Sequence, residues 1–212
     1  MSKVSAYEEF KDKLQSGELQ PGQFITQKEF ASLANVPIAA AREAIQKLEH
    51  ESLLKVHPQR GIQIADVTLE FIRNAFGLRM ILECDAVRQF AENADNRDVA
   101  QKLLDQTSVV LNEAKIDTGA DILERAVEVD WRLHDEIIAG VRNKLVAEIY
   151  QINAARLRLI KTTNRLSPSR VVTALQEHVL ILECCISNDS DGAAKAMQNH
   201  INTAMERAIN GV

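Results

Sequence analysis

The chain of 212 residues is 46% hydrophobic and 26% charged, a balance typical of globular proteins with a sizeable core. Its length allows one large domain or two smaller ones. No apolar run approaches the ~20 residues that a membrane-spanning helix needs. No signal-peptide core follows the first residues, so we expect a cytoplasmic protein without a membrane partner. Three cysteines, an odd number, favour reduced thiols over a disulfide framework.

The net charge of −5 is unevenly distributed along the chain. Residues 1–65 hold eight basic and eight acidic side chains, whereas residues 66–212 hold 17 basic and 22 acidic ones. A strongly basic domain would by itself indicate nucleic-acid binding. The N-terminal part is neutral, so DNA binding has to be argued from the positions of its charges.

The first 65 residues predict three short helices followed by a β-hairpin. A capping-box pattern at Thr26 and Glu29 marks the start of the second helix, because each side chain can bond the other residue's amide. Pro37 fits the first turn of the third helix. The predicted elements are helices at 4–16, 26–34 and 37–50 and strands at 53–56 and 62–64. This order is typical of a winged helix-turn-helix, whose third helix enters the major groove of DNA.

Polar and basic side chains lie where such a domain contacts DNA. The apolar residues of the third helix occupy one face and leave a polar face opposite. The predicted hairpin has a basic tip. The candidates for DNA contact on the third helix and the hairpin tip are Arg42, Gln46, Lys47, His57, Arg60 and Gly61.

The N-terminal part resembles the GntR family of bacterial transcription regulators. The matching residues are 10–22, 41–49 and the wing glycine Gly61. The resemblance implies that Arg42 contacts DNA and that Lys28 replaces a second DNA-contacting arginine of the family by charge. Ile38 stands where the family has a further arginine, which leaves fewer groups to read base edges.

Residues 66–212 predict a bundle of helices. Thr68 is a favourable N-cap for a long helix, and Ser167 followed by Pro168 marks the start of another. Further helices are predicted at about 97–116, 119–140, 143–164, 168–187 and 191–210. We therefore expect a mainly α protein, with a winged helix-turn-helix domain at 1–65 and an all-α helical bundle at 66–212.

Four side chains of the bundle region form a predicted metal site. Asp130 and His134 are four residues apart in a helix, so both point at the same volume. His178 and His200 lie in consecutive predicted helices, each eleven residues from position 189 in the turn between them. Two antiparallel helices therefore bring both histidines to about the same height. One carboxylate and three imidazoles suit a divalent transition metal.

The bundle region resembles the FCD effector domain of the FadR subfamily of GntR regulators. The matching residues are 78–83, Asp130, His134, 143–145, Glu177, His178 and His200. The resemblance implies that the aspartate and the three histidines hold a divalent cation. Zinc is the default for this ligand set, and nickel and manganese tolerate it as well. The resemblance also implies a homodimer that reads a pseudo-palindromic double-stranded DNA operator.

A metal ion in the bundle would be the largest local charge and would favour a small carboxylate as effector. The resemblance makes Arg79 a candidate cation of the effector pocket. Arg156 and Arg158 are weaker candidates, because arginines on helices are more often solvated surface groups.

These features together predict a metal-binding, ligand-responsive transcription regulator rather than an enzyme. One alternative is a metal-dependent hydrolase or lyase in which the metal activates water, with Glu128 or Glu177 as the base. A third interpretation is a helical metal-binding protein whose N-terminal domain has lost DNA binding. The absence of basic residues at 38–40 keeps this third interpretation open.

Overall fold

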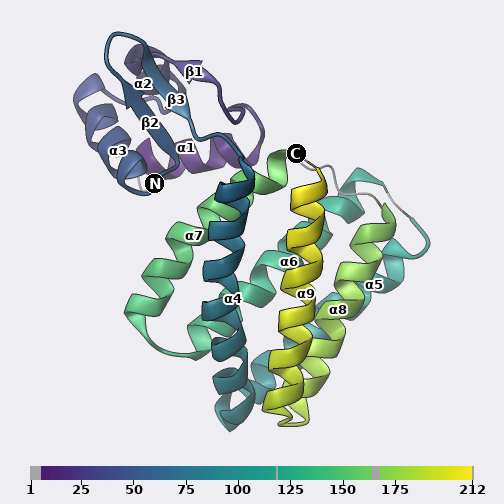
Figure 1. Cartoon of the computed structure of the whole chain (residues 1–212). Coiled ribbons are helices and arrows are strands. Elements are labelled where there is room, and N and C mark those ends of the chain that lie inside the picture. Colours follow the sequence, from purple (N-terminus) through teal and green to yellow (C-terminus); the bar gives the residue numbers. More distant parts are fainter. Residues whose placement is uncertain (1–5, 118, 164–167, 212) are drawn as a thin grey trace. The chain divides into compact units, whose positions relative to one another are not determined.

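A computed structural model describes residues 6–117, 119–163 and 168–211 (Figure 1). The N-terminal elements are α1 (Ala6–Gln15), β1 (Phe24–Ile25), α2 (Gln27–Leu33), α3 (Ile38–His50), β2 (Leu54–His57) and β3 (Gly61–Ile64). The elements that follow are α4 (Leu69–Glu92), the 3-10 helix η1 (Ala94–Asn96), α5 (Arg97–Ala114), α6 (Ala120–Gly140), α7 (Lys144–Thr163), α8 (Pro168–Ile186) and α9 (Ser190–Asn210). The predicted fold class, mainly α with an N-terminal winged helix-turn-helix and a helical bundle, is confirmed.

The chain forms two compact units. In its described parts, unit 1 contains residues 6–75, 152–163 and 208–211. Unit 2 contains residues 76–117, 119–151 and 168–207. Helices α4, α7 and α9 each contribute residues to both units. The domain boundary expected between residues 65 and 66 stays a prediction.

The three strands of unit 1 form an antiparallel sheet in the order β1-β3-β2. Ile62 of β3 pairs with Ile25 of β1 on one side and with Val56 of β2 on the other. Ile62 and Ile64 are fully buried, as expected for alternate residues on the core face of a strand. The sequence did not predict β1, because a strand of two residues is too short to show a repeating pattern.

The start of α2 is capped as the sequence predicted. The amide of Glu29 donates to Thr26 Oγ1 (3.1 Å), and the amide of Thr26 donates to Glu29 Oε2 (2.7 Å). Pro37, expected in the first turn of α3, instead occupies its N-cap with an extended ψ of 150°. The Pro37 carbonyl already accepts the first helical hydrogen bond, from the amide of Ala41 (3.0 Å), so the helix begins one residue later.

Caps also set the ends of the longer helices. Thr68 caps α4 by accepting a hydrogen bond from the amide of Phe71 (3.1 Å). Asp189 closes the turn between α8 and α9, where its carboxylate accepts the amide of Gly192 (2.9 Å). This turn returns α9 alongside α8 (Figure 1). The predicted cap Ser167 and residues 4–5 of the first predicted helix lie outside the described residues.

Unit 2 contains a hydrophobic cluster where α5 packs against α6 and α8. Its buried members are Val110, Leu111, Ala114, Ile122, Ala126, Val171 and Leu175. Burial of these side chains fixes α6 and α8, which carry three of the four predicted metal ligands. Among the described helices, none is long and apolar enough to cross a membrane.

Candidate metal centre and DNA-binding residues

The structure brings Asp130, His134, His178 and His200 together from three helices of unit 2. One potential ligand atom from each residue lies within 4.8 Å of the others. His178 Nε2 is 3.3 Å from Asp130 Oδ1 and 3.4 Å from His200 Nε2, and His134 Nε2 is 4.0 Å from Asp130 Oδ1. The three histidines are buried and Asp130 is partly exposed. The spacing along α6 and the antiparallel turn between α8 and α9 together produce this convergence.

Two charged neighbours fix the tautomer of His134. Arg79 Nη2 lies 2.6 Å from His134 Nε2, and Glu83 Oε2 lies 2.7 Å from His134 Nδ1. A guanidinium can only donate, so Nε2 carries the lone pair and the ring proton sits on Nδ1, facing the carboxylate. Arg79 Nε also donates to Glu83 Oε1 at 2.9 Å. The Nε2 lone pair therefore accepts from Arg79 in this structure, and this bond would have to open for His134 to bind a metal.

His200 is oriented by a second carboxylate. Its Nδ1 donates to Glu177 Oε2 at 2.8 Å, which leaves the Nε2 lone pair facing the cluster. Arg170 holds that carboxylate with two nitrogens, Nη1 at 3.1 Å from Oε1 and Nη2 at 3.3 Å from Oε2. Carboxylates that accept the outer N–H of a metal-binding histidine fix its orientation and raise its basicity.

Electrostatics keep these carboxylates charged and the His200 ring neutral. Burial by itself would raise the pKa of Glu83, but Arg79 and His134 outweigh burial and hold this pKa well below its usual range. Burial also opposes ionisation of Glu177, yet the hydrogen bonds from His200 and Arg170 lower its pKa. Burial lowers the pKa of His200 to about 4, so the ring is neutral near neutral pH.

The four residues fit a divalent transition metal. Zinc lies about 2.0–2.2 Å from nitrogen and oxygen ligands, which places tetrahedral ligand atoms about 3.3–3.6 Å apart. The separations of His178 Nε2 from Asp130 Oδ1 and from His200 Nε2, 3.3 and 3.4 Å, match this spacing. Neutral imidazoles, a carboxylate and charged carboxylates behind two rings are the donor set that such a metal requires.

The predicted DNA-contacting side chains on α2 and α3 differ in the partners that they have within the protein. Lys28, Arg42 and Gln46 are exposed. Arg42 Nε donates a hydrogen bond to Gln27 Oε1 at 3.3 Å. Lys47 Nζ lies 3.6 Å from the centre of the Tyr7 ring. Its ammonium group therefore makes a cation–π contact with Tyr7 in this structure. Arg42 and Gln46 are one helical turn apart and can act as a pair.

The predicted contacts on the wing lie around Phe24. The ring of His57 is 5.4 Å from the Phe24 ring, and His57 Nε2 lies 2.9 Å from Gln63 Oε1. The guanidinium carbon of Arg60 lies 5.7 Å from the centre of the Phe24 ring. Gly61 has a φ of +99°, a conformation that favours glycine. The wing therefore presents the exposed cation Arg60 next to the aromatic ring of Phe24.

The chain matches two known protein-family models. Residues 3–64 match the bacterial regulatory proteins of the gntR family, and residues 74–203 match the FCD domain. The chain belongs to the GntR family and carries an FCD domain. It is therefore a DNA-binding transcriptional regulator.

Named relatives of this GntR-family regulator cover most of its length. It is 24% identical to the HTH-type transcriptional repressor RspR of Escherichia coli (strain K12), over 89% of this chain and 80% of RspR. Its structure matches E. coli McbR/YncC with a TM-score of 0.76 at 18% identity, over 97% of this chain and 95% of that chain. The Zn2+-bound FCD domain of TM0439 matches with a TM-score of 0.52 at 22% identity, over 67% of this chain and 94% of that chain. These structural likenesses show the shared fold.

The three predicted effector contacts of the regulator fall in different places. Arg79 lies in unit 2, buried against His134 and Glu83. Arg156 and Arg158 lie in the part of α7 that belongs to unit 1. Arg156 donates from Nε and Nη2 to the carbonyl of Glu51, at 3.0 and 2.9 Å. The effector roles of all three stay predictions, and the structure gives Arg156 a different partner.

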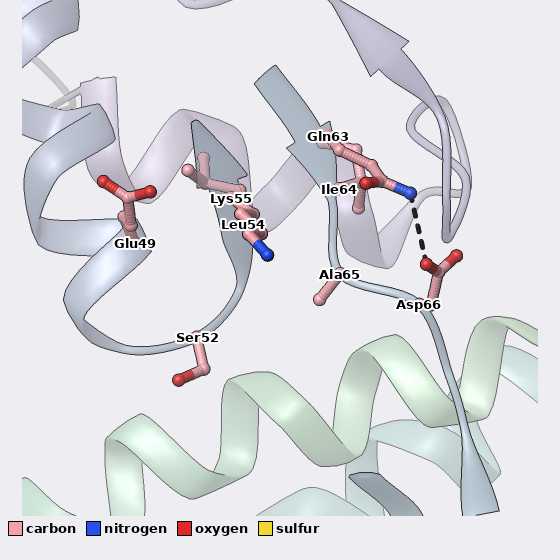
Figure 2. Close-up of a pocket in the computed structure, with 8 residues that line it drawn as sticks. All are labelled: Glu49, Ser52, Leu54, Lys55, Gln63, Ile64, Ala65 and Asp66. Carbon is pink, nitrogen blue, oxygen red and sulfur yellow. Dashed lines mark hydrogen bonds between the residues drawn. The ribbon is translucent and has the colours of Figure 1, made fainter. Parts of the chain in front are cut away.

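A cavity of about 340 Å³ opens beside the wing of unit 1 (Figure 2). It is lined by Glu49, Ser52, Leu54, Lys55, Gln63, Ile64, Ala65 and Asp66. Figure 2 shows the hydrogen bond from Gln63 to Asp66 (3.1 Å) at one side of it. None of the predicted site residues lines this cavity. Its lining contains both acidic and basic side chains, which do not indicate a particular class of ligand.

Sequence reasoning did not assign the carboxylates behind the histidines. The resemblance includes Glu83 among its matching residues but gives it no role, and the enzyme alternative uses Glu177 as a base. The spacing of Arg79 and Glu83, four residues apart on α4, signals an ion pair. No sequence signal pairs α4 with α6, because that contact depends on the packing of the bundle.

Proposed function

We propose that this GntR-family regulator is metal-dependent and ligand-responsive. Its FCD domain would hold a divalent ion, zinc by preference and nickel or manganese as alternatives, through Asp130, His134, His178 and His200. A small carboxylate effector would bind beside that site. A homodimer would bind a pseudo-palindromic operator through the winged domains.

The convergence of ligand atoms carries the proposal. Three imidazoles and one carboxylate gather within 4.8 Å, and two of the rings have carboxylates at their outer nitrogens. The Nε2 atoms of His178 and His200 lie 3.4 Å apart beside the Asp130 carboxylate, and carboxylates behind the outer nitrogens are typical of metal-binding histidines. The Zn2+-bound FCD domain of TM0439, a relative in fold, supports the choice of zinc.

The charge around the centre favours an anionic effector. A bound dication supplies the largest positive charge of the site and attracts carboxylates. Arg79 is 3% exposed and adds a second, permanently charged donor beside His134. The metal ion and the positive charge of Arg79 would together attract an anion, so a small organic acid is the proposed effector class.

Metal binding is tested with the purified protein and three variants. Asp130→Ala and His178→Ala should lose stoichiometric zinc, because each removes a ligand from the cluster. His50→Ala is the matched control, since His50 is an exposed histidine of α3 in unit 1. Zinc at about a hundred times its Kd should stabilise the wild type by ~2.7 kcal/mol. Unchanged zinc content and zinc-dependent melting in both ligand variants would rule out this site.

Operator binding is tested by selecting genomic fragments with the purified protein. The wild type should enrich one short palindrome, and Arg42→Ala should weaken it by about 1–3 kcal/mol and relax one base position. Lys28→Ala should weaken binding to all sequences and reduce the salt slope by about one, as expected for a phosphate contact. Lys102→Ala, which removes an exposed lysine of α5, controls for loss of one positive charge. Failure of the wild type to enrich any sequence would contradict operator binding.

A further inference from the structure

The C-terminal end of α3 is held by a residue far away in the sequence. Arg156 donates from Nε and Nη2 to the carbonyl of Glu51, which is the C-cap of α3. The last carbonyls of a helix have no partner within the helix, and they carry partial negative charge. Two donors of one guanidinium on such a carbonyl both satisfy the acceptor and neutralise this charge.

The same residue, Glu51, is fixed from its side chain as well. Glu51 is 4% exposed, and its carboxylate accepts a hydrogen bond from the Tyr7 hydroxyl at 2.6 Å. The Tyr7 ring in turn lies under Lys47 of α3, with 3.6 Å between Nζ and the ring centre. Glu51 thus ties the end of α3 to α1 through its carboxylate and to α7 through its carbonyl.

This contact joins the two family segments of the chain. Glu51 lies in the segment that matches the gntR family, and Arg156 lies in the segment that matches the FCD domain. Both residues belong to unit 1, because α7 enters that unit at Ile152. The FCD segment therefore supplies part of the support of the DNA-reading helix.

Helix α7 also reaches the surroundings of the metal centre. Tyr150 of α7 lies in unit 2 and is 1% exposed. Burial raises its pKa, and the negative charge of Glu83, which contacts His134, raises it further. Arg156 follows six residues later, about 9 Å along the helix. Helix α7 thus carries a residue of each unit.

We propose that Arg156 is a positioning residue for operator recognition. It holds the C-terminal end of α3 on α7, and so fixes the orientation of the helix that carries Arg42. Recognition groups must be held within about 0.5 Å of their productive positions, so a loose helix end weakens base contacts. This inference rests on the proposed operator binding and adds the element that orients it.

The test compares Arg156→Ala and Arg156→Lys with Arg73→Ala. Arg73 is an exposed arginine of α4 in unit 1, so its removal matches the change in charge. Hydrogen exchange reports directly on the end of α3 through the amides of Glu51, Ser52 and Leu53, which are bonded to carbonyls of α3. Zinc content reports on unit 2, and the affinity for the wild-type operator reports on recognition.

We expect Arg156→Ala to keep its zinc, to exchange these amides at least tenfold faster and to bind the operator at least tenfold more weakly than Arg73→Ala. The exchange rate and operator affinity of Arg156→Lys should lie between those of Arg156→Ala and Arg73→Ala. A lysine ammonium cannot place two donors on one carbonyl as the guanidinium does. Exchange and affinity equal to those of Arg73→Ala would overturn the proposal. Faster exchange with unchanged operator affinity would also overturn it, because the contact would then be structural only.

Two further outcomes separate this inference from neighbouring explanations. A weaker affinity with unchanged exchange and a salt slope reduced by about one would make Arg156 a phosphate ligand, and the positioning role would be wrong. If the wild type selects no operator, the proposed operator binding fails. The exchange comparison then decides by itself whether Arg156 holds the end of α3.

Discussion

Glu177 accepts a hydrogen bond from His200 at 2.8 Å, and this contact decides which nitrogen of the ring faces the cluster. The carboxylate is itself held by two nitrogens of Arg170. His200 therefore cannot turn its Nδ1 inward without breaking a charge-assisted hydrogen bond. The orientation of the proposed ligand is fixed before any metal arrives.

Substitution of Glu177 should weaken metal binding without removing a ligand. In Glu177→Gln the amide can still accept from His200, but the negative charge that raises the basicity of the ring is lost. We expect zinc affinity to fall about 10–100-fold, the range for outer-shell carboxylates of metal-binding histidines. Competition titration against a chromophoric chelator measures this change. Glu183→Gln, on the same helix but exposed, is the control, and equal affinities of the two variants would contradict the role of Glu177.

Glu83 should contribute to stability as well as to the metal site. Its carboxylate and the Arg79 guanidinium, 0% and 4% exposed, form an ion pair of 2.9 Å inside unit 2. Glu83→Ala leaves the buried guanidinium without its carboxylate, a change that typically costs about 3–5 kcal/mol. Urea denaturation of the metal-free protein measures the loss. A loss below about 1 kcal/mol would show that solvent replaces the carboxylate.

Local patterns predicted the elements of this fold because their signals lie within one helix. The capping box of Thr26 and Glu29 and the cap at Thr68 appear in the structure with their expected hydrogen bonds. The 3-10 helix at 94–96 and the strand at 24–25 were not predicted, because two or three residues carry no period. The lengths of helices and strands are therefore predictable only where apolar residues recur at a regular spacing along the element.

The candidate metal site was predictable in part for the same reason. Asp130 and His134 share one helix face, and the turn at Asp189 sets the heights of the other two histidines. The carboxylates that contact the outer nitrogens of the histidine rings could not be predicted in this way. The contact between Glu83 and His134 joins residues 51 positions apart on α4 and α6, and only the packing of the bundle creates it. Arg156 shows the same limit, since its contact with Glu51 spans 105 residues.

Gly61 should matter for the shape of the wing rather than for a DNA contact of its own. A Cβ at this position would lie 2.7 Å from the backbone oxygen of Ile25, and the φ of +99° disfavours any other residue. We expect Gly61→Ala to lower the free energy of unfolding by about 1–3 kcal/mol and to disturb the pairing of β1 with β3. Zinc content should not change.

Gly77→Ala provides the matched control for Gly61. Gly77 lies within α4, and a Cβ there would meet nothing within 4 Å. An alanine in a helix interior is favoured over glycine, so this variant should gain up to about 1 kcal/mol. Equal stabilities of the two variants, measured by urea denaturation, would show that the wing tolerates a side chain at position 61.

The two tyrosines of the chain should make the protein sensitive to alkali. Burial raises the pKa of Tyr7, and its hydrogen bond to Glu51 and the negative charge of that residue raise it further. Burial, then the charge of Glu83, raises the pKa of Tyr150. Above the ordinary pKa of about 10, the unfolded chain loses phenol protons that the folded chain keeps.

Stability contributed by the two phenols is therefore complete below about pH 10 and is lost as the pH rises beyond it. We expect phenolate absorbance to appear only together with unfolding. Tyr7→Phe should reduce the loss of stability between about pH 8 and about pH 11, because one of the two shifted phenols is gone. Tyr150→Phe should reduce it independently, since the two residues lie in different units. Ionisation of both tyrosines near pH ~10 in the folded protein would contradict the buried contact between Tyr7 and Glu51.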